Sequence, residues 1–321
     1  MSDPTPNLIR WQTRHVIVVV APGQGSQTPG FLEPWLDAPG MRDHLSEISN
    51  GAGMDLIAHG TTSDADTIRD TRVAQPLIVA AGLLTLSALF ADGRREKVGG
   101  VAGHSVGEIT AAAAAGILSE TDAVAFVSER GRAMADAAAV EPTGMSAVIG
   151  GDRTALLERL EHLGLQPANF NGGCQIVVAG LMSALASLAE ESVPGARVIP
   201  LQVAGAFHTR YMKSAVAQLE AFASGLRKHD PTMPIWTNRD GTRIVDGARF
   251  VELMVGQASS AVRWDLTMDS LLAAGVTGII ELAPAGALVG LAKRGMKGIP
   301  SVAVKTPDDL EAAHAMIDGA P

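Results

Sequence analysis

The chain contains few aromatic and few charged residues. Of its 321 residues, 4% are aromatic and 18% are charged, whereas 47% are hydrophobic. The core must therefore be built from Ala, Val, Leu and Ile in close layers, which suits helices packed on a sheet. The hydrophobic fraction excludes a disordered chain, and the length allows one sizeable core or two unequal ones.

Disulfides and an excess of basic charge are also missing. Cys174 is the one cysteine, so the chain cannot form an internal disulfide. The residues after Met1 lack the basic region, apolar run and cleavage site of a signal peptide, so we expect a cytoplasmic protein. The formal net charge of −9 argues against wide binding of nucleic acid or attachment to an anionic membrane, although it leaves room for a local basic patch.

No clean membrane-spanning run and no metal-binding motif is present. The longest apolar stretch, Val73 to Phe90, is interrupted by polar residues, Pro76 and Gly82, so it falls short of the 18 or more clean residues that a span requires. We expect a buried helix there, with Pro76 near its first turn. No H-E-x-x-H or clustered Cys/His spacing predicts a metal site.

What the chain does contain is a series of strand and helix patterns. Residues 1–15 carry two prolines and no apolar period, and we expect a flexible leader. Val16 to Val20 is a β-branched run, typical of a strand buried on both faces. The further patterns predict strands at 98–102, 277–282 and 301–304 and helices at 109–116, 119–134 and about 212–226.

The segment from about 144 to 203 has its own order of elements. Its patterns predict, in sequence, a strand at 145–149, a helix at 153–163, strands at 167–171 and 175–179, a helix at 182–191 and a strand at 197–203. This βαββαβ order is the ferredoxin-like pattern. We therefore predict a ferredoxin-like subdomain at 144–203, inserted into a larger α/β domain formed by 16–143 and 204–321.

A serine between two glycines gives the sharpest chemical signal. Gly103-x-Ser105-x-Gly107 lies between a predicted strand and a predicted helix, which is the nucleophile-elbow arrangement. The glycines permit a strained turn that exposes the hydroxyl, and the helix start directs N–H groups at the reacting oxygen. The sequence therefore predicts a nucleophilic serine, with a structural turn as the alternative.

A serine nucleophile needs a base, and eight histidines are available. His208 follows a predicted strand among small residues that leave room for a substrate, and from the residues alone a functional and a packing role stay open. For His104 we expect a packing role, because its side chain should point away from that of Ser105.

Two further features leave alternatives open. The loop from Gly23 to Gln27 follows the first strand, but Thr28 breaks the G-x-G-x-x-G register, so it is either a simple turn or a source of an oxyanion donor at Gln24. Arg130 lies in an apolar helix, where a charged residue is usually on the solvated face. If it faces inward, its guanidinium suits a substrate carboxylate.

Taken together, the motifs resemble the malonyl-CoA:acyl carrier protein transacylases of fatty-acid and polyketide synthesis, from Val16 to about Leu310. The resemblance rests on residues 22–27, 73–76, 103–108, 130–131, 169–171, 205–208, Gln257 with 262–264, and 291–294. It implies a hydrolase-like α/β domain with the ferredoxin-like insertion. It also implies transfer of malonyl from malonyl-CoA to the phosphopantetheine thiol of an acyl carrier protein, with no bound cofactor.

The resemblance assigns roles to individual residues. Ser105 would be the nucleophile and His208 its base, and Gln257 would orient the histidine through its backbone carbonyl. The oxyanion donors would be at Gln24 and the backbone N–H of Val106. The remaining roles are the pairing of the malonyl carboxylate with Arg130, the selection of malonyl by Phe207, and a place in the pocket for Asn171.

Two other classes of function stay in view. A serine hydrolase acting on a small thioester would share Ser105 and His208, and a non-catalytic carrier-binding module would need neither. We expect a monomer that docks the acidic carrier protein on a basic patch formed by Lys293, Arg294 and Lys297. The sequence departs from the family pattern at Ala261, Ala285 and Cys174, none of which is a predicted catalytic position.

Overall fold

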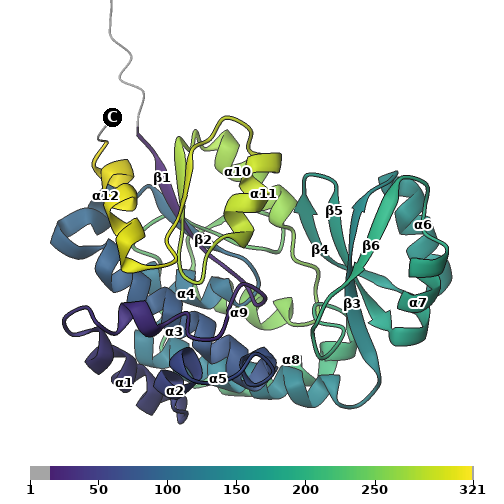
Figure 1. Cartoon of the computed structure of the whole chain (residues 1–321), viewed down its shortest axis with the longest axis horizontal. Coiled ribbons are helices and arrows are strands. Elements are labelled where there is room, and N and C mark those ends of the chain that lie inside the picture. The colour runs from purple at the N-terminus through teal and green to yellow at the C-terminus, as the bar shows by residue number, and fades with distance from the viewer. Residues whose placement is uncertain (1–14, 320–321) are drawn as a thin grey trace, which may run out of the picture.

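A computed structural model describes residues 15–319, and the predicted leader lies outside them except for His15. Six strands in this range form one sheet in the order β10-β9-β1-β2-β7-β8, parallel except for β8 (Figure 1). Their bounds are β1 Ile17–Ala21, β2 Gly100–Gly103, β7 Ile235–Trp236, β8 Arg243–Ile244, β9 Gly278–Glu281 and β10 Ser301–Ala303. The four predicted strands are confirmed, with ends that differ by at most two residues. The short β7 and β8 were not predicted.

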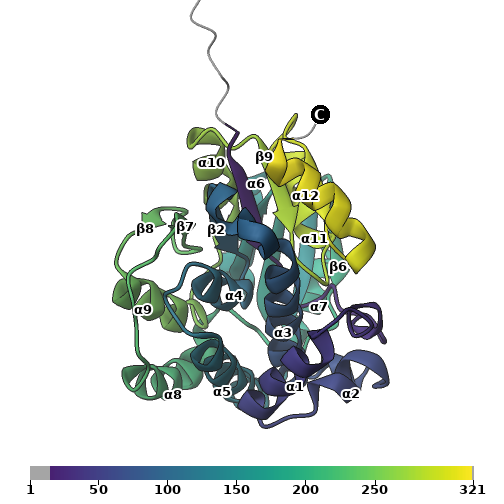
Figure 2. The same ribbon diagram turned by 90° about the vertical axis from the view of Figure 1, so that its left-hand side faces the viewer.

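Helices cover both faces of this sheet, as the β-branched run predicts. Ile17 and Val19 of β1 pack into one core with α3 (Thr71–Leu89), α4 (Gly107–Ala114), α5 (Glu120–Ala138), α8 (Lys213–Ser224) and α9 (Gly247–Gln257). Val18 and Val20 face a second core with α10 (Trp264–Ala273) and α11 (Ala287–Gly295). Outside the first layer lie α1 (Met41–Ala52) and α2 (Leu56–Thr61), as Figure 2 shows.

The long apolar helix α3 is a core helix. It packs against α4 and α5 (Figure 2), and 78% of its most apolar window is buried. By length and composition it is the one helix in residues 15–319 that could cross a membrane. Because Asp70 caps it by accepting from the N–H of Arg72, the helix starts at Thr71. The prediction for Pro76 was therefore wrong, since this residue lies inside the helix, in its second turn.

A second, antiparallel sheet stands beside the first (Figure 1). It contains β3 (Thr143–Gly150), β4 (Gln166–Gly172), β5 (Gln175–Leu181) and β6 (Ala196–Pro200) in the order β4-β5-β3-β6. The helices α6 (Arg153–Leu163) and α7 (Met182–Glu190) complete the βαββαβ order and cover one face with their own core. The mixed α/β fold with a ferredoxin-like second sheet is thus confirmed, although β6 ends three residues before the predicted Val203.

The opposite face of the antiparallel sheet turns toward the large core. Met145 and Ala147 of β3 and Val177 and Ala179 of β5 belong to the same cluster as the helices of the parallel sheet, whereas Val148 belongs to the core under α6 and α7. This alternation follows from the two-residue period of a strand. The two sheets therefore share a packed boundary, and the candidate site lies along it.

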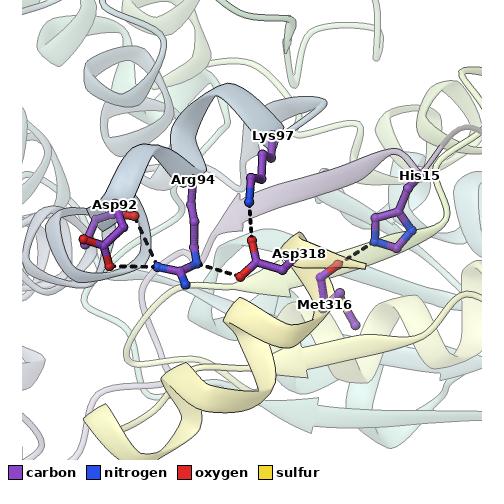
Figure 3. Close-up of polar contacts among 7 residues, drawn as sticks. His15, Asp92, Arg94, Lys97, Met316 and Asp318 are labelled. Carbon is purple, nitrogen blue, oxygen red and sulfur yellow. Dashed lines mark hydrogen bonds and ion pairs between the residues drawn. The ribbon is translucent and has the colours of Figure 1, made fainter. Parts of the chain in front are cut away.

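Polar contacts hold the last helix, α12 (Leu310–Asp318), beside the start of β1 (Figure 3). Its Asp318 accepts from Arg94 Nε at 3.1 Å and from Lys97 Nζ at 2.7 Å, both on the short helical segment Ala91–Lys97. His15 Nε2 lies 2.5 Å from the backbone oxygen of Met316. Residues from both ends of the described chain therefore lie in contact.

Candidate active site

Ser105 occupies a strained turn between β2 and α4. Its φ is +54°, in the left-handed region that a residue with a Cβ adopts rarely. A Cβ on Gly103 would lie 2.1 Å from the backbone of Gly107, and a Cβ on Gly107 would lie 2.2 Å from the carbonyl oxygen of Ala21. Glycine is required at both positions because the backbones approach so closely. This explains the G-x-S-x-G spacing from which the turn was predicted.

His208 reaches this turn from the segment after β6. Its Nε2 lies 2.7 Å from Ser105 Oγ, and its Nδ1 lies 2.8 Å from the backbone oxygen of Gln257. Because a carbonyl can only accept, Nδ1 carries the hydrogen and Nε2 is free to accept the serine proton. Burial, together with the charge of Arg130, lowers the pKa of His208 to about 3. The histidine is therefore a neutral base held against the serine.

The side chain of Gln257 links several buried groups. Its Oε1 accepts from Arg130 Nη2 at 2.9 Å, and its Nε2 donates to Glu108 and, at 3.2 Å, to Asn238 Oδ1. A second donor nitrogen of Arg130 lies 2.7 Å from Gln75 Oε1. Arg130 is 1% exposed, so it faces inward, and the usual expectation of a solvated position does not hold.

A cavity of about 480 Å³ opens at the serine, between the two sheets. Six of the predicted site residues line it: Gln24, Ser105, Val106, Asn171, Phe207 and His208. Its wall also includes Gln75, Met134 and Met145, and Arg294 stands among its lining residues. The other two predicted residues, Arg130 and Gln257, do not line it, and Gln75 separates Arg130 from the open space.

The backbone N–H groups of Gln24 and Val106, both near the serine, have no hydrogen-bond partner within residues 15–319. The side-chain amide of Gln24 donates to the carbonyl of Arg69 at 3.2 Å. The backbone N–H of Gln24 is therefore the donor that this residue can offer to the cavity. Val106 immediately precedes α4, where the dipole of the helix adds to the attraction for negative charge. Both residues border the cavity beside Ser105.

His104 packs edge-on against Trp264, with ring centroids 5.6 Å apart, in agreement with its expected packing role. It also lines the cavity, where its Nε2 lies 3.0 Å from Asn171 Oδ1. Burial lowers the pKa of His104, so the ring is neutral. Asn171 is thereby held at the cavity wall by a partner that the sequence did not suggest.

Sequence reasoning missed Asn238, whose Oδ1 accepts from the N–H of Ser105 at 2.7 Å. It also gave no role to Gln75 or Glu108, although both lie in the motifs that carry the resemblance. The polar run after Trp236 contains Asn238, but β7 before it is too short to be predicted, and nothing near Asn238 in the sequence indicates Ser105 as its partner. No cluster of three or more His, Cys, Asp or Glu side chains in the described range could hold a metal ion.

Comparison with known proteins connects this geometry to a family. The model for the acyl transferase domain matches residues 18–311. The malonyl CoA-acyl carrier protein transacylase of Mycobacterium tuberculosis (strain ATCC 25618 / H37Rv) is 49% identical over 300 residues, which cover 92% of this chain and 98% of that protein.

Solved structures agree with this match. The crystal structure of MCAT from Mycobacterium tuberculosis has a TM-score of 0.91 at 48% identity, covering 94% of this chain and 100% of that one. A malonyl-transacylase in complex with its type II PKS acyl-carrier protein has a TM-score of 0.87 at 27% identity, covering 93% and 98%. The chain therefore belongs to the acyl transferase domain family.

Proposed function

We propose that the protein transfers the malonyl group of malonyl-CoA to the phosphopantetheine thiol of an acyl carrier protein, through a malonyl ester on Ser105. The observation that carries this proposal is the 2.7 Å contact between Ser105 Oγ and a neutral, oriented His208 at the wall of the cavity. The names of the relatives, malonyl CoA-acyl carrier protein transacylases, supply the substrate class.

The first half-reaction forms the ester. His208 Nε2 takes the proton of Ser105 as Oγ attacks the thioester carbonyl of malonyl-CoA. The negative oxygen is held by the backbone N–H groups of Gln24 and Val106, and one such donor is worth about 3 kcal/mol in comparable enzymes. The C–S bond then breaks, and the coenzyme A thiolate leaves with the proton from the imidazolium of His208.

The second half-reaction uses the same groups in the same order. His208 accepts the proton of the carrier thiol, whose sulfur attacks the malonyl ester. The proton returns to Ser105 Oγ as the ester bond breaks, and malonyl-carrier protein leaves. Both halves balance with groups of this chain and its two substrates.

Arg130 selects the malonyl carboxylate. Its guanidinium is buried behind Gln75 and Gln257, so a carboxylate must replace one amide oxygen to reach it. Gln75 lines the cavity and is the side chain that would move. An acetyl group carries no carboxylate to replace an amide oxygen, so it leaves Arg130 paired with Gln75 and Gln257 and gains no charge-assisted hydrogen bond from it. Phe207 and Asn171, which line the cavity, bound the space for the acyl group.

The acidic carrier protein docks on the patch formed by Lys293, Arg294 and Lys297. All three side chains are exposed at the end of α11 or just after it, and Arg294 lines the cavity where it donates to Gln175 at 3.3 Å. Reversing the charges of Lys293 and Arg294 should raise the KM for the carrier protein at low salt. An unchanged KM would remove the patch from the docking surface.

The test is the intact mass of the protein after brief mixing with malonyl-CoA or acetyl-CoA. We expect a malonyl adduct that Ser105→Ala abolishes and that acetyl-CoA scarcely forms. Continuous release of coenzyme A without an adduct and without a carrier protein would identify a hydrolase instead. No reaction, with carrier binding unaffected by Ser105→Ala, would identify a binding module.

A further inference from the structure

Glu108 is a buried acid that the reaction proposed above does not use. It lies in the first turn of α4, three residues after Ser105, and is 1% exposed. An acidic side chain is almost never buried so completely unless it is paired or hydrogen-bonded. Its partners therefore show what it does.

Both oxygens of the Glu108 carboxyl group accept hydrogen bonds. Oε1 accepts from the backbone N–H of Asn238 at 2.6 Å, and Oε2 accepts from the Nε2 of Gln257. Arg130, which can only donate, occupies the Oε1 of Gln257. The amide of Gln257 is thus held between the guanidinium of Arg130 and the carboxyl group of Glu108 and has one possible orientation.

Each of these two partners touches one member of the dyad. The backbone oxygen of Gln257 accepts from His208 Nδ1. The side chain of Asn238 accepts from the N–H of Ser105 and donates to the carbonyl of Gly103, both at 2.7 Å, across the turn that exposes the serine. Glu108 is therefore connected to the base through Gln257 and to the nucleophile through Asn238.

Burial opposes the hydrogen bonds and the charge of Arg130 in setting the protonation of Glu108. Burial raises the pKa of Glu108 to about 8, while the hydrogen bonds from Asn238 and Thr237 and the charge of Arg130 favour its carboxylate. Burial lowers the pKa of Arg130 to about 10, and the charge of Glu108 acts in the opposite direction. The protonation of Glu108 and that of Arg130 are therefore linked.

We propose that Glu108 is a positioning residue of the dyad, which holds Gln257 for the orientation of His208 and Asn238 for the backbone at Ser105. Only the choice of malonyl-CoA as the reagent rests on the function proposed above. The geometry of Ser105 and His208 can also be tested with a fluorophosphonate, a neutral reagent that labels an activated serine and needs no carboxylate site.

Three variants separate positioning from folding. Glu108→Gln keeps the shape but replaces one acceptor oxygen by an NH₂ group, which then faces the N–H of Asn238 or Gln257. Glu108→Asp keeps the carboxyl group and withdraws it by one methylene. Glu220→Gln makes the same substitution at an exposed position of α8 and serves as the control.

The measurement is the rate of Ser105 modification, by rapid-quench intact mass, over a range of fluorophosphonate and of malonyl-CoA concentrations. For Glu108→Gln we expect the maximal rate to fall about tenfold or more with both reagents, because small misplacements of reacting groups cost this much. The malonyl-CoA concentration giving half the maximal rate should change less than about threefold, Glu108→Asp should be intermediate, and Glu220→Gln should match wild type.

A folded Glu108→Gln protein that is labelled at the wild-type rate would overturn the proposal. Labelling of Glu108→Asp at the wild-type rate would overturn it too. If Glu108→Gln does not fold, the rate of Glu108→Asp alone decides. A wild-type protein that reacts with the fluorophosphonate but not with malonyl-CoA would instead refute the proposed malonyl transfer. In that case the fluorophosphonate rates of the variants still test the role of Glu108.

Discussion

Replacing Ser105 by glycine should leave a more stable protein than replacing it by alanine. Both variants remove the hydroxyl and its 2.7 Å contact with His208, so they lose the same hydrogen bond. They differ in the Cβ, which alanine keeps at a backbone φ of +54°. The comparison therefore isolates the strain at the turn.

The size of the difference follows from two opposing effects. A residue with a Cβ in the left-handed region costs about 1–2 kcal/mol. Glycine avoids this cost but loses about 0.5–1 kcal/mol more than alanine through the freedom of the unfolded chain. We expect Ser105→Gly to exceed Ser105→Ala by about 0.5–1 kcal/mol in the free energy of unfolding.

Urea unfolding followed by tryptophan fluorescence measures this difference. The control is Ser187 within α7, which makes no left-handed turn. There, glycine should be less stable than alanine by about 1 kcal/mol. If alanine is as stable as glycine or more stable at position 105, while the order at Ser187 is as expected, Ser105 is not strained and our explanation of the turn is wrong.

Three further predictions concern titration and backbone strain. Because the folded pKa of His208 is lowered to about 3, the rate of Ser105 acylation should not fall as the pH drops from 7 to 5, which stopped-flow release of coenzyme A measures. Glu108 has a raised folded pKa of about 8, so its contribution to stability is complete below its unfolded value and is lost as the pH rises toward 8. Between pH 6.5 and 8, urea unfolding should show wild type losing stability relative to Glu108→Gln, by up to about 1.4 kcal/mol per pH unit, and parallel curves would contradict this. Cys174 has a φ of +62° in an exposed turn, so Cys174→Gly should be more stable than Cys174→Ala by about 0.5–1 kcal/mol in the same assay, and the opposite order would contradict the strain.

Much of the fold was predictable because its strongest patterns are local. The β-branched run of β1 and the alternating strands of the antiparallel sheet show their burial within a few residues. The two-residue strands β7 and β8 are too short to show a period, so nothing in the sequence predicted them. The prediction for Pro76 was wrong because its place in α3 depends on the cap at Asp70, three residues before the start that we predicted for that helix.

The candidate site, too, was predictable only where its residues carry a local pattern. Ser105 was predictable because a strained turn needs glycines beside it in the sequence, and His208 because few histidines lie among small residues. Asn238 acts on Ser105 across 133 residues, and no local pattern encodes such a contact. The inward orientation of Arg130 depends on Gln75 and Gln257, which come from two other helices.

The contact between His15 and α12 affects how this unit can be joined to other polypeptides. The cavity lies at the carboxyl ends of β1 and β2, whereas His15 and Asp318 lie at the amino end of β1 (Figure 3). Five residues of strand, about 16 Å, separate these two levels of the sheet. A tether attached near either residue leaves on the side away from the substrate entrance. The catalytic unit can therefore be carried within a longer chain, or closed into a ring by a short linker, with its cavity still open to a carrier.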